Sequence, residues 1–230
     1  DIGGGSIQIS LFDKDTLVAT QNLRLGVLRL QEHLDRMNAK PSKSEVLLEE
    51  MIQSQLAVFK KMYLKDRTIE NIIVVDDYVS SLVRRQLASS QNPGYVDSAS
   101  YHMFMDYMRS HTRQEAAVHF GVAEESIPLI FISATMLKCM VRLMEAKLIW
   151  APGVTLCDGI AYEYAEKNKI LVSKHDFEQD IVACARNISK RFMGSRRRGE
   201  TLEHICVTIF DSMRRVHGLG KRERLLLRIA

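Results

Sequence analysis

Three consecutive glycines near the start of the sequence constrain the fold more than any other feature. Residues 1–6 read DIGGGS, and residues 7–12 read IQISLF, which alternates apolar and polar side chains with the period of a β-strand. After a short turn, residues 16–21 form a second predicted strand, so residues 1–21 are expected to be a hairpin opened by a glycine loop. Because such a loop normally follows a strand, we expect further sequence upstream of Asp1.

The residue types in this loop indicate anion binding. Gly3, Gly4 and Gly5 allow the backbone to approach a ligand closely and to point successive N–H groups at it, which suits phosphate oxygens. Asp1 is able to hold Mg²⁺ or orient water, and Ser6 adds a hydroxyl donor. The alternative is a plain hairpin turn. The acidic residue before the glycines, the hydroxyl after them and the strand that follows favour phosphate binding.

The rest of residues 1–172 reads as a mixed α/β domain with flanking helices. Helices are predicted at 26–37, 43–65, 78–89, 98–110, 112–119, 124–145 and 159–168, strands at 69–75 and 147–151, and a loop at 89–94. The predicted apolar face of helix 43–65 comprises Val46, Leu47, Met51, Leu56, Phe59 and either Met62 or Tyr63. Residues 127–141 are the most apolar stretch, but Lys138 interrupts them, so a buried helix explains them better than a membrane span.

The character of the chain changes after about residue 172. Only helices are predicted there, at 174–192, 199–217 and 221–230, with a run of three arginines in a connector. The last helix is apolar and has no cap before Ala230. We therefore expect a second, all-helical segment over residues 173–230 that continues past this terminus.

Composition excludes some functions and leaves others open. The net charge of +4, from 32 basic and 28 acidic residues, is too mild to indicate nucleic-acid binding. The cysteines show no zinc-binding spacing, and no signal peptide is recognisable. They are Cys139, Cys157, Cys184 and Cys206. We predict a cytoplasmic protein with reduced thiols and without nucleic-acid or membrane partners; whether it forms a homodimer is left open.

The glycine loop resembles the phosphate-binding loop of the actin-like ATPase superfamily, and most closely that of the exopolyphosphatase–guanosine pentaphosphatase (Ppx/GppA) family. Other stretches resemble that family in the same order along the chain: a Leu-Gly-x-x-Arg segment, a late strand with the loop that follows it, and the first helices of an HD-like domain. These stretches are residues 24–30, 150–160, 204–210 and 217–224. The resemblance implies that residues 1–172 are the second lobe of an actin-like (ribonuclease H-like) domain and that residues 173–230 begin a truncated HD-like domain.

The resemblance also implies a reaction. It is the release of terminal phosphate from inorganic polyphosphate or guanosine pentaphosphate, with Mg²⁺ or Mn²⁺ as cofactor. Asp1 and Gln8 take catalytic positions, and Asp1 binds the metal. The phosphate-binding positions are Gly3, Gly4, Gly5, Ser6 and Arg29. The family's catalytic carboxylate lies in an N-terminal lobe that this sequence does not include, so this chain by itself is expected to be inactive.

Departures from the family pattern keep other hypotheses open. Gln8 replaces a glutamate, residues 75–80 (VDDYVS) replace a Gly-Thr-Ser-Gly-like loop, and Cys157 replaces an arginine. The first alternative is a regulatory module that binds polyphosphate or a guanosine alarmone without hydrolysing it. The second is a phosphotransferase of the sugar-kinase or acid-kinase type, which the changed loop at 75–80 disfavours.

Some other residues have two interpretations each. Asp76 and Asp77 are either a metal pair or, as we favour, an N-cap for helix 78–89. The run Arg196, Arg197 and Arg198 either guides polyphosphate or is a solvated connector. His204 matches one HD-type ligand, but a single ligand makes no site, so a structural role is expected. Cys157, next to Asp158 near a helix start, is either a thiol with a lowered pKa or, as we favour, structural.

The histidines His102, His111 and His119 do not share a helical face, so no common site is predicted for them.

Overall fold

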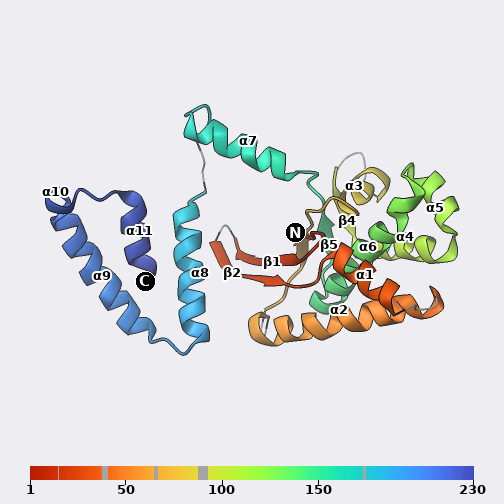
Figure 1. The fold of residues 1–230 in the computed structure, drawn as a ribbon, viewed down its shortest axis with the longest axis horizontal. Coiled ribbons are helices and arrows are strands. Elements are labelled where there is room, and N and C mark those ends of the chain that lie inside the picture. Colours follow the sequence, from red (N-terminus) through yellow and green to blue (C-terminus); the bar gives the residue numbers. More distant parts are fainter. Residues whose placement is uncertain (15, 38–40, 65–66, 88–92, 173–174) are drawn as a thin grey trace. The chain divides into compact units, whose positions relative to one another are not determined.

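The computed structural model describes residues 1–230 except residue 15 and the segments 38–40, 65–66, 88–92 and 173–174 (Figure 1). The chain divides into two compact units, which we call unit 1 (residues 1–8 and 22–165) and unit 2 (residues 9–21 and 166–230). This division groups part of the hairpin with the C-terminal helices. The boundary predicted at residue 172 placed the whole hairpin in the first domain, and it stays a prediction.

Unit 1 is built around a three-stranded mixed sheet. The central strand β5 (Leu148–Trp150) lies parallel to β3 (Asn71–Ile73) and antiparallel to β4 (Tyr95–Asp97). Ile149 is buried and pairs with Val96, which is also buried. The sequence predicted β3 and β5 but not β4, and part of the loop predicted at 89–94 lies outside the described residues. The fold is therefore α/β, with a mixed sheet.

Unit 1 also contains a set of helices (Figure 1). They are α1 (Val27–Arg36), α2 (Pro41–Tyr63), α3 (Ser80–Leu82), α4 (Ser98–Ser110), α5 (Arg113–Phe120), α6 (Ile127–Met144) and α7 (Leu156–Lys167), which runs into unit 2. A π-helical turn at Val83–Leu87 continues α3, and a 3-10 turn at Glu124–Ser126 precedes α6. The predicted helix 78–89 is thus partly π-helical, and its last two residues lie outside the described part of the chain.

Helix α6 is the core of unit 1. It packs against α1, α2, α4 and α5. Within the described residues, Glu124–Met144 is the one helical segment that is long and apolar enough to cross a membrane, and 67% of its most apolar window is buried inside the protein. The prediction of a buried helix is confirmed. Its one central cation, Lys138, bonds to Glu49 and lies 3.6 Å from Glu45, both on α2.

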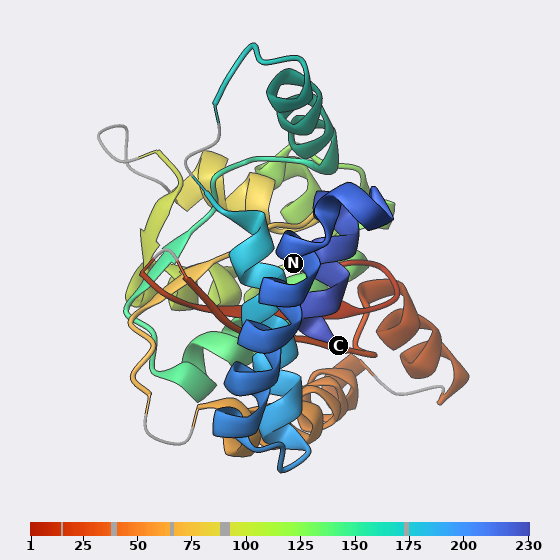
Figure 2. The same cartoon turned by 90° about the vertical axis from the view of Figure 1, so that its left-hand side faces the viewer.

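Unit 2 combines a hairpin with helices (Figures 1 and 2). The predicted hairpin is confirmed as β1 (Ile7–Asp13) and β2 (Thr16–Leu23), and the helices are α8 (Phe177–Arg191), α9 (Arg196–Ser212), α10 (Arg214–His217) and α11 (Lys221–Ile229). Helices α8, α9 and α11 pack against one another. The connector predicted for Arg196, Arg197 and Arg198 is wrong: these residues open α9, because the Ser195 hydroxyl accepts the N–H of Arg198 and caps the helix.

Candidate phosphate-binding site

The glycine loop is a tight turn closed by backbone pairing. Asp1 and Gln8 exchange hydrogen bonds of 2.9 Å, and Ile2 pairs with Ile7. Inside the turn, the N–H of Gly3 donates to the carbonyl of Ser6 at 2.9 Å. Ile2 also donates to Val75 at 2.9 Å, which attaches the loop to the segment after β3. The hairpin-turn interpretation therefore describes the backbone of the loop, but it leaves several N–H groups unexplained.

The carbonyl groups of the loop face helix α1. Val27 N–H donates to Gly3 O at 3.0 Å, and Leu28 N–H donates to Gly4 O at 3.0 Å. The first N–H groups of a helix have no partner within the helix, so these bonds satisfy both the helix and the loop. A side chain at Gly26 would prevent this approach, because its Cβ would lie 2.1 Å from Gly4 O. Gly26 thus permits the docking of the loop on α1.

The direction of the carbonyls determines the direction of the amides. In a trans peptide the C=O and the following N–H point in opposite directions, and the described residues contain no cis peptide bond. Since Gly3 O and Gly4 O point at α1, the N–H groups of Gly4 and Gly5 point away from it. None of these amides has a hydrogen-bond partner among the described residues. They form the kind of nest that binds an anion.

Arg29 and Ser6 complete the loop. The Nε of Arg29, on α1, donates to Gly5 O at 3.2 Å, so the Ser6 N–H also points away from α1, and it too lacks a partner in the described part of the chain. The Ser6 hydroxyl accepts from Asn22 Nδ2 at 3.2 Å and keeps its own proton for donation. The structure brings Arg29 to the loop, as expected, but its Nε binds the carbonyl side rather than the amide side.

The acidic residues of the motifs and Gln8 have different surroundings. Asp1 and Gln8 are both exposed. The carboxylate of Asp76 accepts the N–H groups of Val79 (3.0 Å) and Ser80 (2.6 Å) and the Ser133 hydroxyl. This is the capping role that we favoured over a metal pair. Within the described residues, no group of three or more His, Cys, Asp or Glu side chains converges on a metal position.

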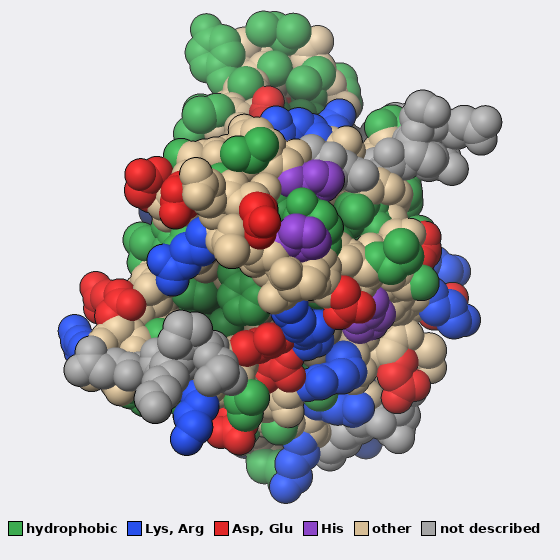
Figure 3. Space-filling model, turned by 90° about the vertical axis from the view of Figure 1, so that its right-hand side faces the viewer, with side chains coloured by type: hydrophobic (Ala, Val, Ile, Leu, Met, Phe, Trp, Pro, Cys, Tyr) green, Lys and Arg blue, Asp and Glu red, His purple; other side chains and the backbone are tan. Residues whose placement is uncertain are grey.

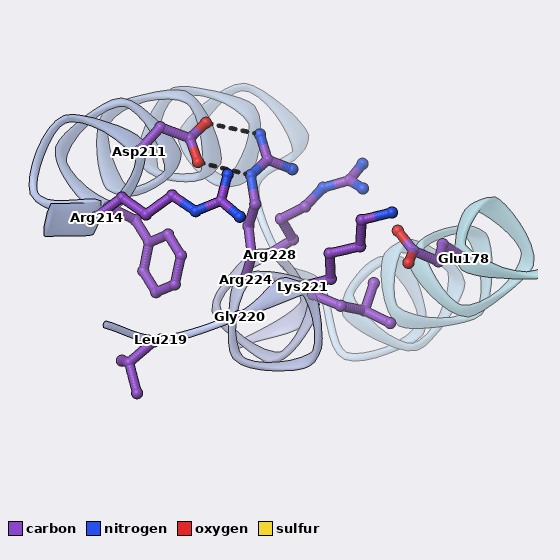
Figure 4. A pocket seen from close by; sticks show the side chains of 10 residues that line it. Glu178, Asp211, Arg214, Leu219, Gly220, Lys221, Arg224 and Arg228 are labelled. Carbon is purple, nitrogen blue, oxygen red and sulfur yellow. Dashed lines mark hydrogen bonds and ion pairs between the residues drawn. The ribbon is translucent and has the colours of Figure 1, made fainter. Parts of the chain in front are cut away.

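A cavity of about 310 Å³ in unit 2 is a second place to consider (Figure 4). It lies among α8, α9 and the start of α11 and carries several arginines. Arg224 binds Asp211 through two bonds of 2.8 and 2.9 Å, and this hydrogen bonding holds the pKa of Asp211 below its ordinary value. Arg228 pairs with Glu203 at 3.0 Å. Arg224 and Arg228, which already bind carboxylates, line this cavity together with Arg214 and Lys221. We therefore place the candidate site at the glycine loop.

Histidine side chains gather on the face of unit 1 where α4 and α5 lie (Figure 3). The rings of His111 and His119 stack on Tyr107 with centroid distances of 3.9 and 4.4 Å. The argument from a common helical face missed this cluster, because α4 ends at Ser110 and α5 folds back from the Thr112 cap. Both imidazoles are used in stacking, which makes the cluster a packing feature.

All four cysteines are free thiols. Burial, followed by the nearby Glu49 carboxylate, raises the pKa of Cys139 to about 11, so this thiol stays protonated and unreactive. Cys157 is exposed near the start of α7.

Solved structures resemble this chain, whereas comparisons by sequence find no match. No protein-family model matches the chain, and no curated protein matches it. An exopolyphosphatase from Cytophaga hutchinsonii ATCC 33406 matches with a TM-score of 0.55 and 16% identity, covering 72% of this chain and 55% of that chain. A Ppx/GppA family member from Aquifex aeolicus matches with a TM-score of 0.54 and 13% identity, covering 73% and 55%.

A further structure, of the Aquifex aeolicus PPX-GPPA enzyme, gives a TM-score of 0.51 and 12% identity, covering 65% of this chain and 50% of that one. This chain therefore spans about half the length of the solved structures that it matches. The likeness shows that it has the fold of the Ppx/GppA structures.

Proposed function

We propose that this chain carries the phosphate-binding loop of a Ppx/GppA-type phosphohydrolase, which releases terminal phosphate from inorganic polyphosphate, guanosine pentaphosphate or both. One observation carries the proposal: the amides of Gly4, Gly5 and Ser6 point away from α1 and have no partner among the described residues. Successive free amides bind phosphate oxygens, and the exposure of Gly5 leaves the loop open to a ligand.

The loop residues have distinct roles in this proposal. The amides hold the terminal phosphate, and the Ser6 hydroxyl donates to one of its oxygens. Arg29 and the first turn of α1 fix the carbonyls, which keeps the amides in place as charge develops on the phosphate during hydrolysis. Preorganised donors of this kind stabilise a transition state because they need no rearrangement when the charge appears.

The residues fit Mg²⁺ or Mn²⁺ only if the phosphates of the substrate supply some of the ligands. Such ions usually keep several waters and are held by one or two carboxylates together with the phosphates of the substrate. Asp1 offers an exposed carboxylate next to the loop, and the amide of Gln8 is a poorer ligand. When bound, the metal would neutralise charge on the phosphates. The catalytic carboxylate that the resemblance implies belongs to the other lobe.

The alternative is a module that binds polyphosphate or a guanosine alarmone without hydrolysis. The capping role of Asp76 favours it, since both oxygens of this carboxylate already accept hydrogen bonds, from Val79, Ser80 and Ser133. Gln8 in place of an acidic residue favours it as well. Both functions require the same anion site, so binding and turnover are tested separately.

The test of the site compares two substitutions at one position. A Cβ on Gly5 meets nothing within 4 Å, so Gly5→Ala adds a methyl group without a clash and Gly5→Asp adds a negative charge in the same place. We expect Gly5→Ala to bind pyrophosphate like the unchanged chain and Gly5→Asp to lose at least 10-fold in affinity, measured by calorimetry with Mg²⁺. Equal affinity of all three proteins would contradict the site.

Turnover is measured as Mg²⁺-dependent phosphate release from polyphosphate and from guanosine pentaphosphate. It compares this chain with one that also carries the N-terminal lobe. Release by the longer chain alone supports the hydrolase. Binding without release by either chain would move the conclusion to the regulatory module.

A further inference from the structure

The segment after β3 places a tyrosine hydroxyl beside the glycine loop. A methyl group added to Gly4 would lie 2.9 Å from Leu28 Cδ1 and 3.6 Å from Tyr78 Oη, so the hydroxyl and the Leu28 side chain both lie beside Gly4. The Tyr78 side chain is half-buried, and its hydroxyl has no hydrogen-bond partner among the described residues. A half-buried phenol usually bonds to a polar group, so this hydroxyl is free to bond to a ligand at Gly4.

The backbone around Tyr78 is held firmly. Ile2 N–H donates to Val75 O on its N-terminal side. On its C-terminal side, Asp76 accepts the N–H of Val79, and the Ser80 hydroxyl donates to Asp76 O at 2.7 Å. Val79 and Ser80 are buried. Because the segment is anchored on both sides, the backbone of Tyr78 is fixed, and this limits where the hydroxyl can lie.

The hydroxyl is a donor and not an anion at ordinary pH. Burial raises the pKa of Tyr78, and the carboxylates of Asp77 and Asp76 raise it further. The group therefore stays protonated. A protonated hydroxyl interacts with an anionic ligand by donating its hydrogen.

We propose that Tyr78 is a ligand-binding residue whose hydroxyl donates to a second oxygen of the phosphate group held by the glycine loop. This inference rests on the proposed function of the loop and extends it by naming a residue and a ligand class. The amides of Gly4 and Gly5 bind one oxygen, and Tyr78 binds a neighbouring one. Such a pair of contacts selects a tetrahedral oxyanion, such as a terminal phosphoryl group, over a spherical halide.

The experiment uses pyrophosphate with Mg²⁺ and the full 230-residue chain. Tyr78→Phe removes the hydroxyl alone. The control is Tyr95→Phe, which removes a partly exposed hydroxyl on β4 while its ring keeps stacking on Trp150. We expect Tyr78→Phe to weaken pyrophosphate binding about 10-fold, as for other hydrogen bonds to a charged group, and Tyr95→Phe to leave it unchanged.

Amide NMR signals of Gly4 and Gly5 separate this inference from the loop assignment. Shifts on addition of pyrophosphate in both the unchanged chain and Tyr78→Phe, with a 10-fold difference in midpoint, support the inference. Equal midpoints would overturn the role of Tyr78 while the loop assignment stands. Absence of shifts in the unchanged chain would overturn both, and an equal loss in Tyr95→Phe would overturn the specific role of this hydroxyl.

Discussion

Substituting Gly26 tests whether docking on α1 holds the glycine loop in place. In Gly26→Ala the new Cβ would lie 2.1 Å from Gly4 O and 2.2 Å from the carbonyl carbon of Gly5. These neighbours are backbone atoms, which cannot rotate away as the end of a side chain can. The loop must therefore move off the first turn of α1, and the bonds that Val27, Leu28 and Arg29 donate to it are lost.

The expected loss of stability follows from these bonds. Each contributes about 1 kcal/mol net, so losing the three backbone bonds that α1 donates lowers the free energy of unfolding by roughly 2–4 kcal/mol. Such a change is roughly a 30-fold or larger shift in the unfolding equilibrium. The matched control is Gly5→Ala, where the added methyl group meets nothing within 4 Å, and it should change stability by less than about 0.5 kcal/mol.

Tryptophan fluorescence in urea is the assay. Trp150, the one tryptophan of the sequence, lies on β5 and reports on unit 1. If Gly26→Ala unfolds at the same urea concentration as Gly5→Ala, the loop is not held by α1 and the argument on amide direction loses its basis. Pyrophosphate affinity should fall in parallel, because a displaced loop no longer aligns its amides.

Two further predictions concern the charge cluster between α2 and α6. Lys138→Met removes the nearest cation of the partly buried Glu49 carboxylate, which keeps Arg142 at 3.4 Å and Arg109 at 3.8 Å. We expect it to cost about 1–2 kcal/mol of stability, whereas Arg36→Met at an exposed pair should cost under about 0.5 kcal/mol; similar losses in urea would contradict the argument. Burial alone would raise the pKa of Glu49, but the bond and charge of Lys138 lower it on balance. A carboxyl group whose pKa is lowered by folding stabilises the protein at pH values above its ordinary pKa, and this stabilisation is lost as the pH falls through the folded-state pKa. Glu49→Gln should therefore make the stability fall less steeply at acid pH. An unchanged fall would contradict this.

Local patterns predicted most of the strands and helices but not the pairing of the strands in unit 1. The alternation in residues 7–12 and the apolar run of α6 depend on the periods of strand and helix, and both predictions are confirmed. Strand β4 has three residues, and its register is set by Ile149, far along the chain. No local pattern identifies so short an edge strand, because only its partner defines it.

The buried face of α2 shows how tertiary packing decides between two apolar stripes. The sequence prediction included Val46, which is 57% exposed, and Met51. The predicted Leu56 and Phe59 are buried, together with Leu48 and Ile52, which the prediction did not include. These buried positions are separated by four, four and three residues, which fits the helical period, and the same rotation of the helix brings Glu49 to Lys138 on α6.

The sequence predicted the residue types of the candidate site but not the orientation of its peptide groups. The motif identified the residue types that allow an anion nest, and Arg29 was expected near it. The direction of each peptide plane depends on which atoms of α1 the loop carbonyls meet, and that depends on the close approach at Gly26. The bonds that satisfy the first turn of the helix are therefore the same bonds that turn the loop amides outward. Stability of this contact and affinity for phosphate are coupled as a consequence, and a substitution that weakens one should weaken the other without touching the ligand.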